Sequence, residues 1–258
     1  MIVMENAVVR YPSFELDCSM EVSEGTITGI VGENGAGKTT LFKALLGLVP
    51  IASGNVKING LDIAELSLAD RESIGFVFND TASTEIYTIK DLNRLLKNFY
   101  RKFDESYFLR KCDDFHLPKD QRLKEFSTGM KAKLKTLTAL SHEALLLILD
   151  EPTSGLDVSA RYEILDILQD YLVDHPQCSI LISSHISSNL EKLCDDIYYL
   201  KAGKVLLHED TDRLLDAYGV LKVDEEAMQQ LDRNFLLYQK RTNYGYDLLT
   251  DQRLFYME

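Results

Sequence analysis

The feature that most constrains the fold of this chain is a glycine-rich stretch, GENGAGKTT, at residues 32–40. It matches the pattern G-x-x-x-x-G-K-[ST], in which a glycine-rich backbone loop surrounds a phosphate group. A strand-sized apolar run at 26–31 precedes the loop. A helix pattern follows it, with an apolar face at Leu41, Ala44, Leu45 and Leu48. A strand, a phosphate loop and a helix in this order predict an α/β domain that binds phosphate.

Each residue type in the loop suits that chemistry. Glycines let the backbone turn its N–H groups inward, toward phosphate oxygens. Lys38 supplies a positive charge for the outer phosphates, and the hydroxyl of Thr39 is a hard oxygen ligand suited to Mg²⁺. The following helix directs its positive end at the anion. The residues expected to bind the phosphates are Gly32, Asn34, Gly35, Ala36, Gly37, Lys38, Thr39 and Thr40. A glycine-rich turn with a surface lysine is the structural alternative.

A pair of acids, Asp150 and Glu151, follows the apolar run at 144–149. Parallel sheets bind ligands at the carboxyl ends of their strands. Because adjacent residues of a strand point to opposite sides, we expect the two carboxylates to have different roles. We predict that Asp150 holds Mg²⁺ beside Thr39, and that Glu151 faces the γ-phosphate and positions or deprotonates water. A solvated strand end, where acids are common, is the alternative interpretation.

Strand and helix patterns alternate along the chain, which predicts a mostly parallel sheet with helices on its faces. Apolar and polar residues alternate at 14–22, as in a half-buried strand. Further strands are predicted at 74–78, 145–149, 179–183 and 197–200. From about 88 to 143 the pattern is polar and mostly helical, which predicts an inserted helical subdomain. A short helix is expected after about Asp210, and the rest of the tail has no assigned role.

Acidic residues outnumber basic ones by 41 to 28, which gives a net charge of −13. We therefore expect no nucleic-acid partner, because binding to nucleic acid needs a basic surface. The four cysteines form no CxxC pair and no zinc-like spacing, so a reducing cytosol is expected. The N-terminus lacks a signal-peptide pattern. The apolar runs are shorter than the roughly 20 residues of a membrane helix, so we expect a soluble chain.

Three further motifs accompany the phosphate loop and the acidic pair, at 126–130 (FSTGM), 154–157 (SGLD) and 184–185 (SH). In this order, the motifs resemble those of the nucleotide-binding subunits of ATP-binding cassette (ABC) transporters. The resemblance implies a P-loop NTPase core of the RecA-like type with a mostly parallel sheet, an N-terminal antiparallel β subdomain and an inserted helical subdomain. It implies an ATPase domain at 1–209 and a C-terminal extension at 210–258.

The resemblance also implies roles for residues outside the phosphate loop. Ser127 and Gly129 would contact the γ-phosphate of an ATP molecule held by a second subunit, and Asp157 would belong to the family's D-loop. His185 would contact the γ-phosphate, and Tyr11 would stack on adenine. Each of these roles has a plainer alternative. The serine motif is also a helix N-capping turn, the histidine can be structural, and the tyrosine can be a packed strand-end residue.

The chain departs from the family pattern at Asn79 and within the signature motif at 126–130. Asn79 stands where the family usually has glutamine, so its amide oxygen would reach Mg²⁺ or water from one methylene closer to the backbone. Thr128 adds a side chain where the family has glycine, so the approach to the partner's nucleotide is expected to be tighter. The sequences FSTGM and VFND are most similar to bacterial ABC-2-type exporter ATPases, whose permease is a separate chain.

Together these observations predict an ATP-binding and ATP-hydrolysing subunit that powers transport, in the export direction, through a separate membrane permease. The predicted catalytic residues are Lys38, Glu151 and His185, and the predicted Mg²⁺ ligands are Thr39, Asp150 and Asn79. The expected partners are ATP, the permease and a second ATPase subunit, identical or different, at the inner face of the cell membrane. Two alternatives are a soluble ABC ATPase outside transport and a regulatory module that binds ATP without turnover.

Overall fold

The structure is a computed structural model that describes residues 1–78, 86–185 and 190–256. The chain divides into two compact units, Met1–His208 and Glu209–Glu258. Among the described residues, no helix combines the length and the apolar character that a membrane crossing requires. The first unit carries all of the predicted site residues, so its sheets and helices decide how the site is built.

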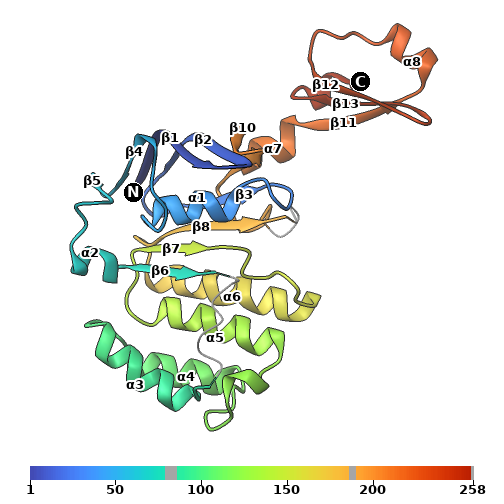
Figure 1. Cartoon of the computed structure of the whole chain (residues 1–258). Coiled ribbons are helices and arrows are strands. Elements are labelled where there is room, and N and C mark those ends of the chain that lie inside the picture. The colour runs from blue at the N-terminus through green and yellow to red at the C-terminus, as the bar shows by residue number, and fades with distance from the viewer. Residues whose placement is uncertain (79–85, 186–189, 257–258) are drawn as a thin grey trace. The chain divides into compact units, whose positions relative to one another are not determined.

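A six-stranded sheet with the strand order β10-β9-β3-β8-β7-β6 forms the centre of the first unit (Figure 1). Its strands are β3 (Ile27–Val31), β6 (Ile74–Val77), β7 (Leu146–Leu149), β8 (Ser179–Ser184), β9 (Asp196–Lys201) and β10 (Lys204–Asp210). The pairs β6–β7, β7–β8, β8–β3 and β3–β9 are parallel, as the alternating pattern predicts. The carboxyl ends of β3, β7 and β8 therefore lie at one edge of the sheet, where ligands bind in such folds.

A second sheet, with the strand order β2-β1-β4-β5, is antiparallel. Its strands are β1 (Ile2–Tyr11), β2 (Phe14–Val22), β4 (Ser53–Ile58) and β5 (Leu61–Asp62). Along β2 the residues alternate between buried and exposed from Glu15 to Val22, as the sequence pattern predicts. The β1–β2 hairpin places Tyr11 directly opposite Phe14, which fixes two aromatic side chains at the same end of this sheet.

The helix α1 (Lys38–Leu45) lies between the two sheets (Figure 1). Its apolar residues are buried in the core that both sheets share, at Leu41, Phe42, Ala44 and Leu45. The expectation that Leu48 continues this face is wrong. Gly47 has a left-handed backbone with φ of 67°, a conformation that ends helices, and Leu48 beyond it is exposed.

Helices α5 (Thr128–Leu140) and α6 (Val158–Asp174) lie on the other side of the six-stranded sheet (Figure 1). The short helix α2 (Leu68–Glu72) precedes β6. The predicted helical insertion forms α3 (Ile89–Phe99), α4 (Glu105–Asp114), a 3₁₀ turn at Leu123–Glu125 and α5. In the described part of this unit, five helices begin after a polar residue that accepts the backbone N–H three positions further on, at Ser67, Thr88, Asp104, Ser127 and Asp157.

The second unit contains a three-stranded antiparallel sheet with the order β11-β13-β12. Its elements are α7 (Thr211–Ala217), β11 (Gly219–Val223), α8 (Glu225–Gln230), β12 (Leu236–Thr242), β13 (Gly245–Thr250) and a 3₁₀ turn at Arg253–Tyr256. Glu225 of α8 contacts both Arg241 and Tyr246, so α8 covers the sheet face that carries these two side chains. The sequence predicts only the first of these elements, the short helix.

Candidate active site

The phosphate loop leaves β3 at Val31 and enters α1 at Lys38. Two of its glycines sit where a side chain would not fit. A Cβ atom at Gly32 would lie 2.4 Å from the carbonyl oxygen of Leu200. At Gly37, which has a φ of 110°, a Cβ would lie 2.7 Å from the ring of Phe14. The turn between strand and helix therefore requires glycine at both positions, as the phosphate-loop pattern implies.

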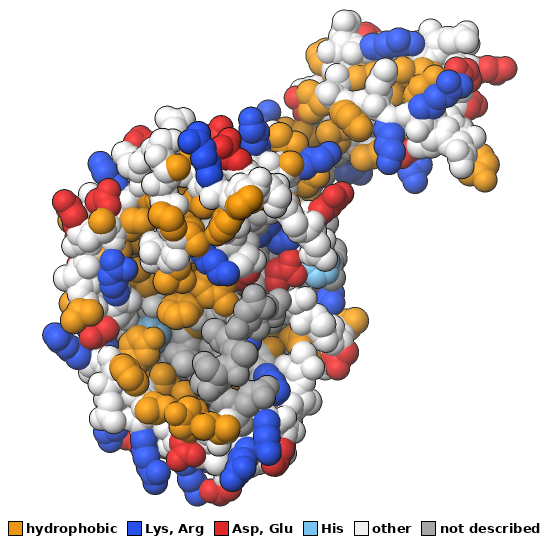
Figure 2. Space-filling view, viewed as in Figure 1, with side chains coloured by type: hydrophobic (Ala, Val, Ile, Leu, Met, Phe, Trp, Pro, Cys, Tyr) orange, Lys and Arg blue, Asp and Glu red, His pale blue; other side chains and the backbone are white. Residues whose placement is uncertain are grey.

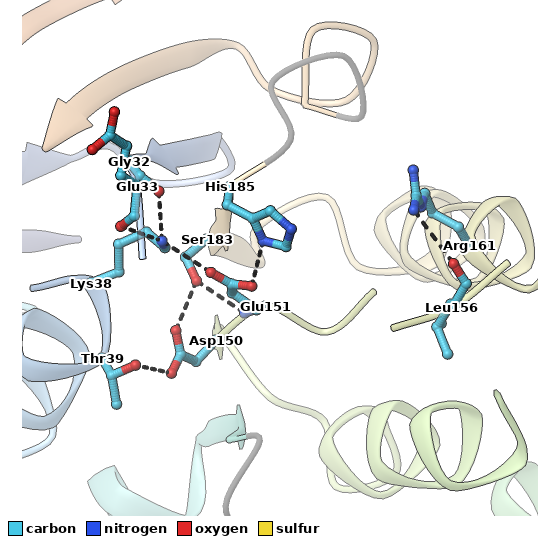
Figure 3. Close-up of polar contacts among 10 residues, drawn as sticks. All are labelled: Gly32, Glu33, Lys38, Thr39, Asp150, Glu151, Leu156, Arg161, Ser183 and His185. Atoms are coloured by element: carbon cyan, nitrogen blue, oxygen red, sulfur yellow. Dashed lines mark hydrogen bonds and ion pairs between the residues drawn. The ribbon is translucent and has the colours of Figure 1, made fainter. Parts of the chain in front are cut away.

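Lys38 is buried at the base of this loop, with 5% of its surface exposed. Its ammonium group donates hydrogen bonds to the carbonyl oxygens of Gly32, at 2.6 Å, and Glu33, at 3.2 Å. It also pairs with the Glu151 carboxylate at 2.9 Å. The loop thus holds a positive charge in place, and in this conformation a protein carboxylate neutralises it (Figure 3).

Thr39 and Asp150 come together as predicted. The Thr39 hydroxyl donates to one Asp150 oxygen at 2.5 Å. The Asp150 side chain is 4% exposed, and its backbone N–H bonds to the carbonyl oxygen of Val77 at the end of the neighbouring strand. A hydroxyl and a carboxylate are hard oxygen donors, which is the ligand chemistry that Mg²⁺ prefers. These two residues therefore fit the predicted metal site, while the third predicted ligand, Asn79, lies outside the described residues.

Glu151 points away from Asp150 for a reason that differs from the predicted one. Strand β7 ends at Leu149, so the alternation of a strand does not reach the pair. Instead, Glu151 has a left-handed backbone with φ of 48°, which is uncommon for a residue with a side chain. Its N–H donates to the Ser183 hydroxyl at 2.9 Å. The turn separates the two carboxylates and gives each its own partners.

The Glu151 carboxylate bridges two cationic or potentially cationic groups. One oxygen contacts Lys38, and the other contacts Nδ1 of His185 at 2.7 Å (Figure 3). Burial of the carboxyl group raises its pKa, but the hydrogen bonds and charges of Lys38 and His185 lower it more. The pKa of Glu151 therefore lies below its ordinary value, and the group is a carboxylate at neutral pH.

Two polar cavities open around these residues, of about 270 and 470 Å³. The smaller is lined by Phe14, Asn34, Gly35, Gly37, Lys38, Thr39, Thr40 and Glu151. The larger is lined by Asn34, Thr39, Lys43, Phe78, Asp150, Glu151, Ser154 and His185. The shared residues Asn34, Thr39 and Glu151 make them two parts of one site. Most of the predicted phosphate-loop residues, both carboxylates and His185 therefore meet here.

Three residues of the predicted nucleotide site lie outside both linings. Gly32 and Ala36 shape the loop instead: their carbonyl oxygens accept hydrogen bonds from Lys38 and from the Gly203 N–H. Tyr11 is the last residue of β1 and is 44% exposed. Its cross-strand neighbour Phe14 lines the smaller cavity, and sequence reasoning missed it. The available signal was the two-residue turn between the two aromatics.

A phosphate loop with a lysine and nearby carboxylates occurs in many nucleotide hydrolases, so comparison with known proteins decides the family. The ABC transporter family model matches residues 16–154 of this chain. The chain belongs to the ABC transporter family as an ATP-binding subunit. Its activity is ATP binding and hydrolysis in a transporter. Membership of this family therefore favours the predicted role in transport over a soluble ABC ATPase outside transport or a regulatory module.

Two curated relatives and one solved structure illustrate the similarity. The lantibiotic transport ATP-binding protein SrtF of Streptococcus pyogenes is 32% identical over 225 residues, covering 86% of this chain and 91% of SrtF. The Nod factor export ATP-binding protein I of Neorhizobium galegae is 30% identical over 211 residues, covering 80% of this chain and 58% of the relative. The solved structure of a dimeric ATP-binding cassette bound to ADP and phosphate has a TM-score of 0.71 at 20% identity. The match covers 82% of this chain and 99% of the cassette. This last likeness shows the shared fold.

In this ABC subunit, the signature residues lie apart from the two cavities. Ser127 caps α5, which begins at Thr128, by accepting the Met130 N–H at 3.2 Å. Asp157 caps α6 by accepting the Ala160 N–H at 2.8 Å. A Cβ at Gly129 would lie 3.6 Å from the Cβ of Ala160, so the starts of the two helices are neighbours. Within one chain these residues act as caps, and their contact with a second subunit's ATP stays a prediction.

Proposed function

We propose that this subunit is one half of a two-subunit ATP-driven motor, which powers export through a separate membrane permease. The observation that carries the proposal is the Glu151 carboxylate, which lies between Lys38 and His185 beside the Thr39–Asp150 pair. This arrangement contains a phosphate-binding cation, a pair of metal-type oxygen donors and a base. Such a set suits hydrolysis of the outer phosphate of ATP.

In the proposed reaction, the loop N–H groups and Lys38 bind the β- and γ-phosphates. Thr39 and Asp150 would hold Mg²⁺, and the ion, when bound, neutralises charge on the phosphate oxygens. The γ-phosphate competes with Glu151 for Lys38, because both are anions that the one ammonium attracts. Glu151 then loses a partner that lowers its pKa, so it becomes a stronger base for the attacking water. His185 keeps the freed carboxylate oriented.

The dimer follows from the position of the signature residues. Ser127 and Gly129 lie at the start of α5, where a hydroxyl and backbone N–H groups suit an anion. They lie outside the cavities that surround Lys38 in the same chain. Two subunits placed head to tail by a two-fold axis would bring each signature to the other's ATP. The likeness in fold to a dimeric cassette with ADP and phosphate supports this pairing.

A separate permease accounts for two further properties. No helix among the described residues could cross a membrane, and in the proposed arrangement the permease supplies the translocation path. Figure 2 shows hydrophobic side chains gathered on the visible face of the molecule. Among the exposed large hydrophobic residues are Phe76 of β6, at 44%, and Phe99 at the end of α3, at 71%. Apolar patches of this kind are typical of protein contacts. The subunit would then sit on the cytoplasmic side of the membrane through its permease. The name of the Nod factor relative supports the export direction.

The direct test is ATP binding and turnover by Lys38→Ala. Removing the ammonium should abolish turnover and weaken ATP binding by tenfold or more, roughly the effect of one strong charged hydrogen bond. Lys57→Ala, on an exposed position of β4, is the matched control and should behave like the parent. Binding and hydrolysis by Lys38→Ala at parent levels would show that the phosphate-loop assignment is wrong.

A further inference from the structure

One buried hydroxyl touches both carboxylates of the site. Ser183 lies near the carboxyl end of β8 and is 1% exposed. Its Oγ donates a hydrogen bond to Asp150 Oδ1 at 2.8 Å and accepts one from the Glu151 N–H at 2.9 Å. In Figure 3 it lies between the two acids. The hydroxyl thus donates its proton to the side chain of Asp150, the predicted metal ligand. With a lone pair it accepts the backbone N–H of Glu151, the predicted base.

For Asp150, Ser183 completes the fixation of the carboxylate. Thr39 bonds to Oδ2 and Ser183 bonds to Oδ1, so each oxygen has one donor. A carboxylate held at both oxygens cannot rotate about its Cβ–Cγ bond without losing a hydrogen bond. Groups that orient a metal ligand in this way are as much part of a metal site as the ligand itself.

For Glu151, Ser183 holds the backbone rather than the side chain. The left-handed conformation at φ of 48° is disfavoured by roughly 1 kcal/mol for a residue with a Cβ. The Ser183 hydroxyl satisfies the N–H of that residue in this conformation. The conformation aims the Glu151 carboxylate at Lys38 and His185. Loss of the hydroxyl would leave the N–H without this partner and remove a hydrogen bond that stabilises the left-handed conformation.

We propose that Ser183 is a positioning residue, which sets the orientation of the metal ligand Asp150 and of the base Glu151 from one hydroxyl. The proposal rests on the proposed roles of those two acids. The Ser183 hydroxyl links the metal site to the base, so that a displacement of one acid would shift the other. The surrounding strand supports a special role: the three preceding residues, Ile180, Leu181 and Ile182, are apolar and at most 1% exposed. A hydroxyl in such a strand is unfavourable unless it is hydrogen-bonded.

The chain offers a matched control on the same strand. Ser179 is fully buried at the other end of β8. Its hydroxyl also accepts a backbone N–H, from Gly25 at 2.9 Å, and donates to an oxygen, that of Ser23, at 3.0 Å. Ser179→Ala therefore removes the same number of hydrogen bonds from the same strand without touching either acid. Any effect common to both variants is a loss of stability, and any effect confined to Ser183→Ala concerns positioning.

The experiment measures kcat, KM and the Mg²⁺ dependence of nucleotide binding. Binding of a fluorescent trinitrophenyl-ATP is titrated with Mg²⁺, so one readout is independent of turnover. Ser183→Ala should lower kcat by about tenfold or more and raise the Mg²⁺ midpoint several-fold, the usual range for a partner that orients a metal ligand. Its KM for ATP should stay within about threefold, because the phosphate loop is untouched. Ser183→Thr, which keeps the hydroxyl, should recover most of kcat.

Two outcomes would overturn the proposal. In the first, Ser183→Ala has a parent-like kcat and Mg²⁺ midpoint. In the second, Ser179→Ala loses as much kcat as Ser183→Ala. If Ser183→Ala does not fold, Ser183→Cys, with a similar shape and a weaker donor, must show the same raised Mg²⁺ midpoint, and a parent-like midpoint overturns the proposal. A failure of the proposed function looks different, because the parent itself would then show no Mg²⁺-dependent turnover.

Discussion

At the scale of single residues, the site is organised by competition for a few polar atoms. Lys38 contacts two carbonyl oxygens and one carboxylate, and Glu151 divides its oxygens between Lys38 and His185. An anionic ligand must enter this network by replacing one of its members. Glu151 is the member that a phosphate can replace, because the carbonyl oxygens belong to the loop that would bind the phosphate.

Tyr11 and Phe14 give the first prediction at this scale. Tyr11→Ala should weaken ATP binding by roughly 1 kcal/mol, the value of an aromatic stacking contact, while Tyr11→Phe stays near the parent. Phe14→Ala should weaken binding as well, because its ring lines the cavity and packs on Gly37. Calorimetric titration with ATP measures both effects. Tyr244→Ala, at a 94% exposed position, is the control.

The two substitutions of Tyr11 also separate stacking from hydrogen bonding. Equal weakening by Tyr11→Ala and Tyr11→Phe would point to the hydroxyl and against stacking. Parent-like binding by Tyr11→Ala together with weakened binding by Phe14→Ala would move the adenine contact from the predicted tyrosine to the phenylalanine.

The sequence predicts most of this site but not its internal contacts. The glycines, Lys38 and Thr39 are recognisable because their spacing reflects the geometry of one short loop. Ser183 is not, because a serine in a strand gives no sign of which carboxylates lie beside it in the neighbouring strand. The Lys38–Glu151 ion pair is equally hidden, since it joins the first residue of α1 to a residue just beyond the end of β7. Contacts of this kind depend on tertiary packing, which spacing along one chain does not encode.

At the scale of elements, helix starts are the most predictable features and element ends the least. Ser127 is recognisable as a helix cap from its residue type and position, whereas the sequence indicates Asp157 only as part of a family motif. The end of α1 depends on the left-handed backbone of Gly47, which the apolar pattern of the helix does not reveal. In the second unit, β12 is exposed at every residue from Leu237 to Arg241, so its sequence lacks the alternation that would have identified the strand.

Ser127 gives a prediction that separates its two roles. Ser127→Ala should lower the free energy of unfolding by about 1 kcal/mol, because it removes the cap of α5. Ser127→Asp should keep the stability, because aspartate is also a favourable cap. If Ser127 contacts a partner's phosphate, however, the aspartate should repel that phosphate and lower turnover strongly. Thermal unfolding and ATPase assays on both variants measure this. Full turnover by Ser127→Asp would leave the serine as a cap alone.

The junction between α3 and α5 gives a prediction about pH. His142, just after α5, is 2% exposed and stacks on Tyr100 at 4.1 Å between ring centres. Burial lowers the pKa of His142, and this outweighs the opposing effects of the Thr138 and Ile74 carbonyls and of Glu72. The unfolded chain then binds a proton more readily than the folded one. Folding stability is therefore lost as the pH falls below about 6.5, the ordinary value for histidine.

The measurement compares melting temperatures at pH 7.5 and 5.5. The decrease between the two should be smaller for His142→Gln than for the parent, whatever the absolute stability of the variant. His116→Asn, at an exposed histidine with a left-handed backbone that asparagine tolerates, is the control and should show the parent's decrease. An identical decrease in His142→Gln and the parent would show that this histidine does not contribute to the pH dependence.

At the scale of the whole molecule, we propose that two subunits share each ATP. In a single chain, a γ-phosphate bound beside Lys38 and Glu151 would stay accessible from the side that faces away from the loop, and the signature residues line neither cavity. Pairing two copies by a two-fold axis would cover the open side of each γ-phosphate and would give each signature a phosphate to bind. ATP would then hold the copies together, and hydrolysis would weaken the contact by removing the γ-phosphate that both copies bind.

The most direct test is the mass of Glu151→Gln in solution, measured by size-exclusion chromatography with light scattering, with and without ATP. The amide keeps the shape of the side chain but removes the base, so the variant should bind ATP, fail to hydrolyse it and accumulate as a dimer of twice the chain mass. Adding Ser127→Arg should abolish that dimer by crowding the partner's nucleotide. A Glu151→Gln protein that stays monomeric at saturating ATP would contradict the pairing of two identical copies, and one that hydrolyses ATP at the parent rate would contradict the role of Glu151 as the base.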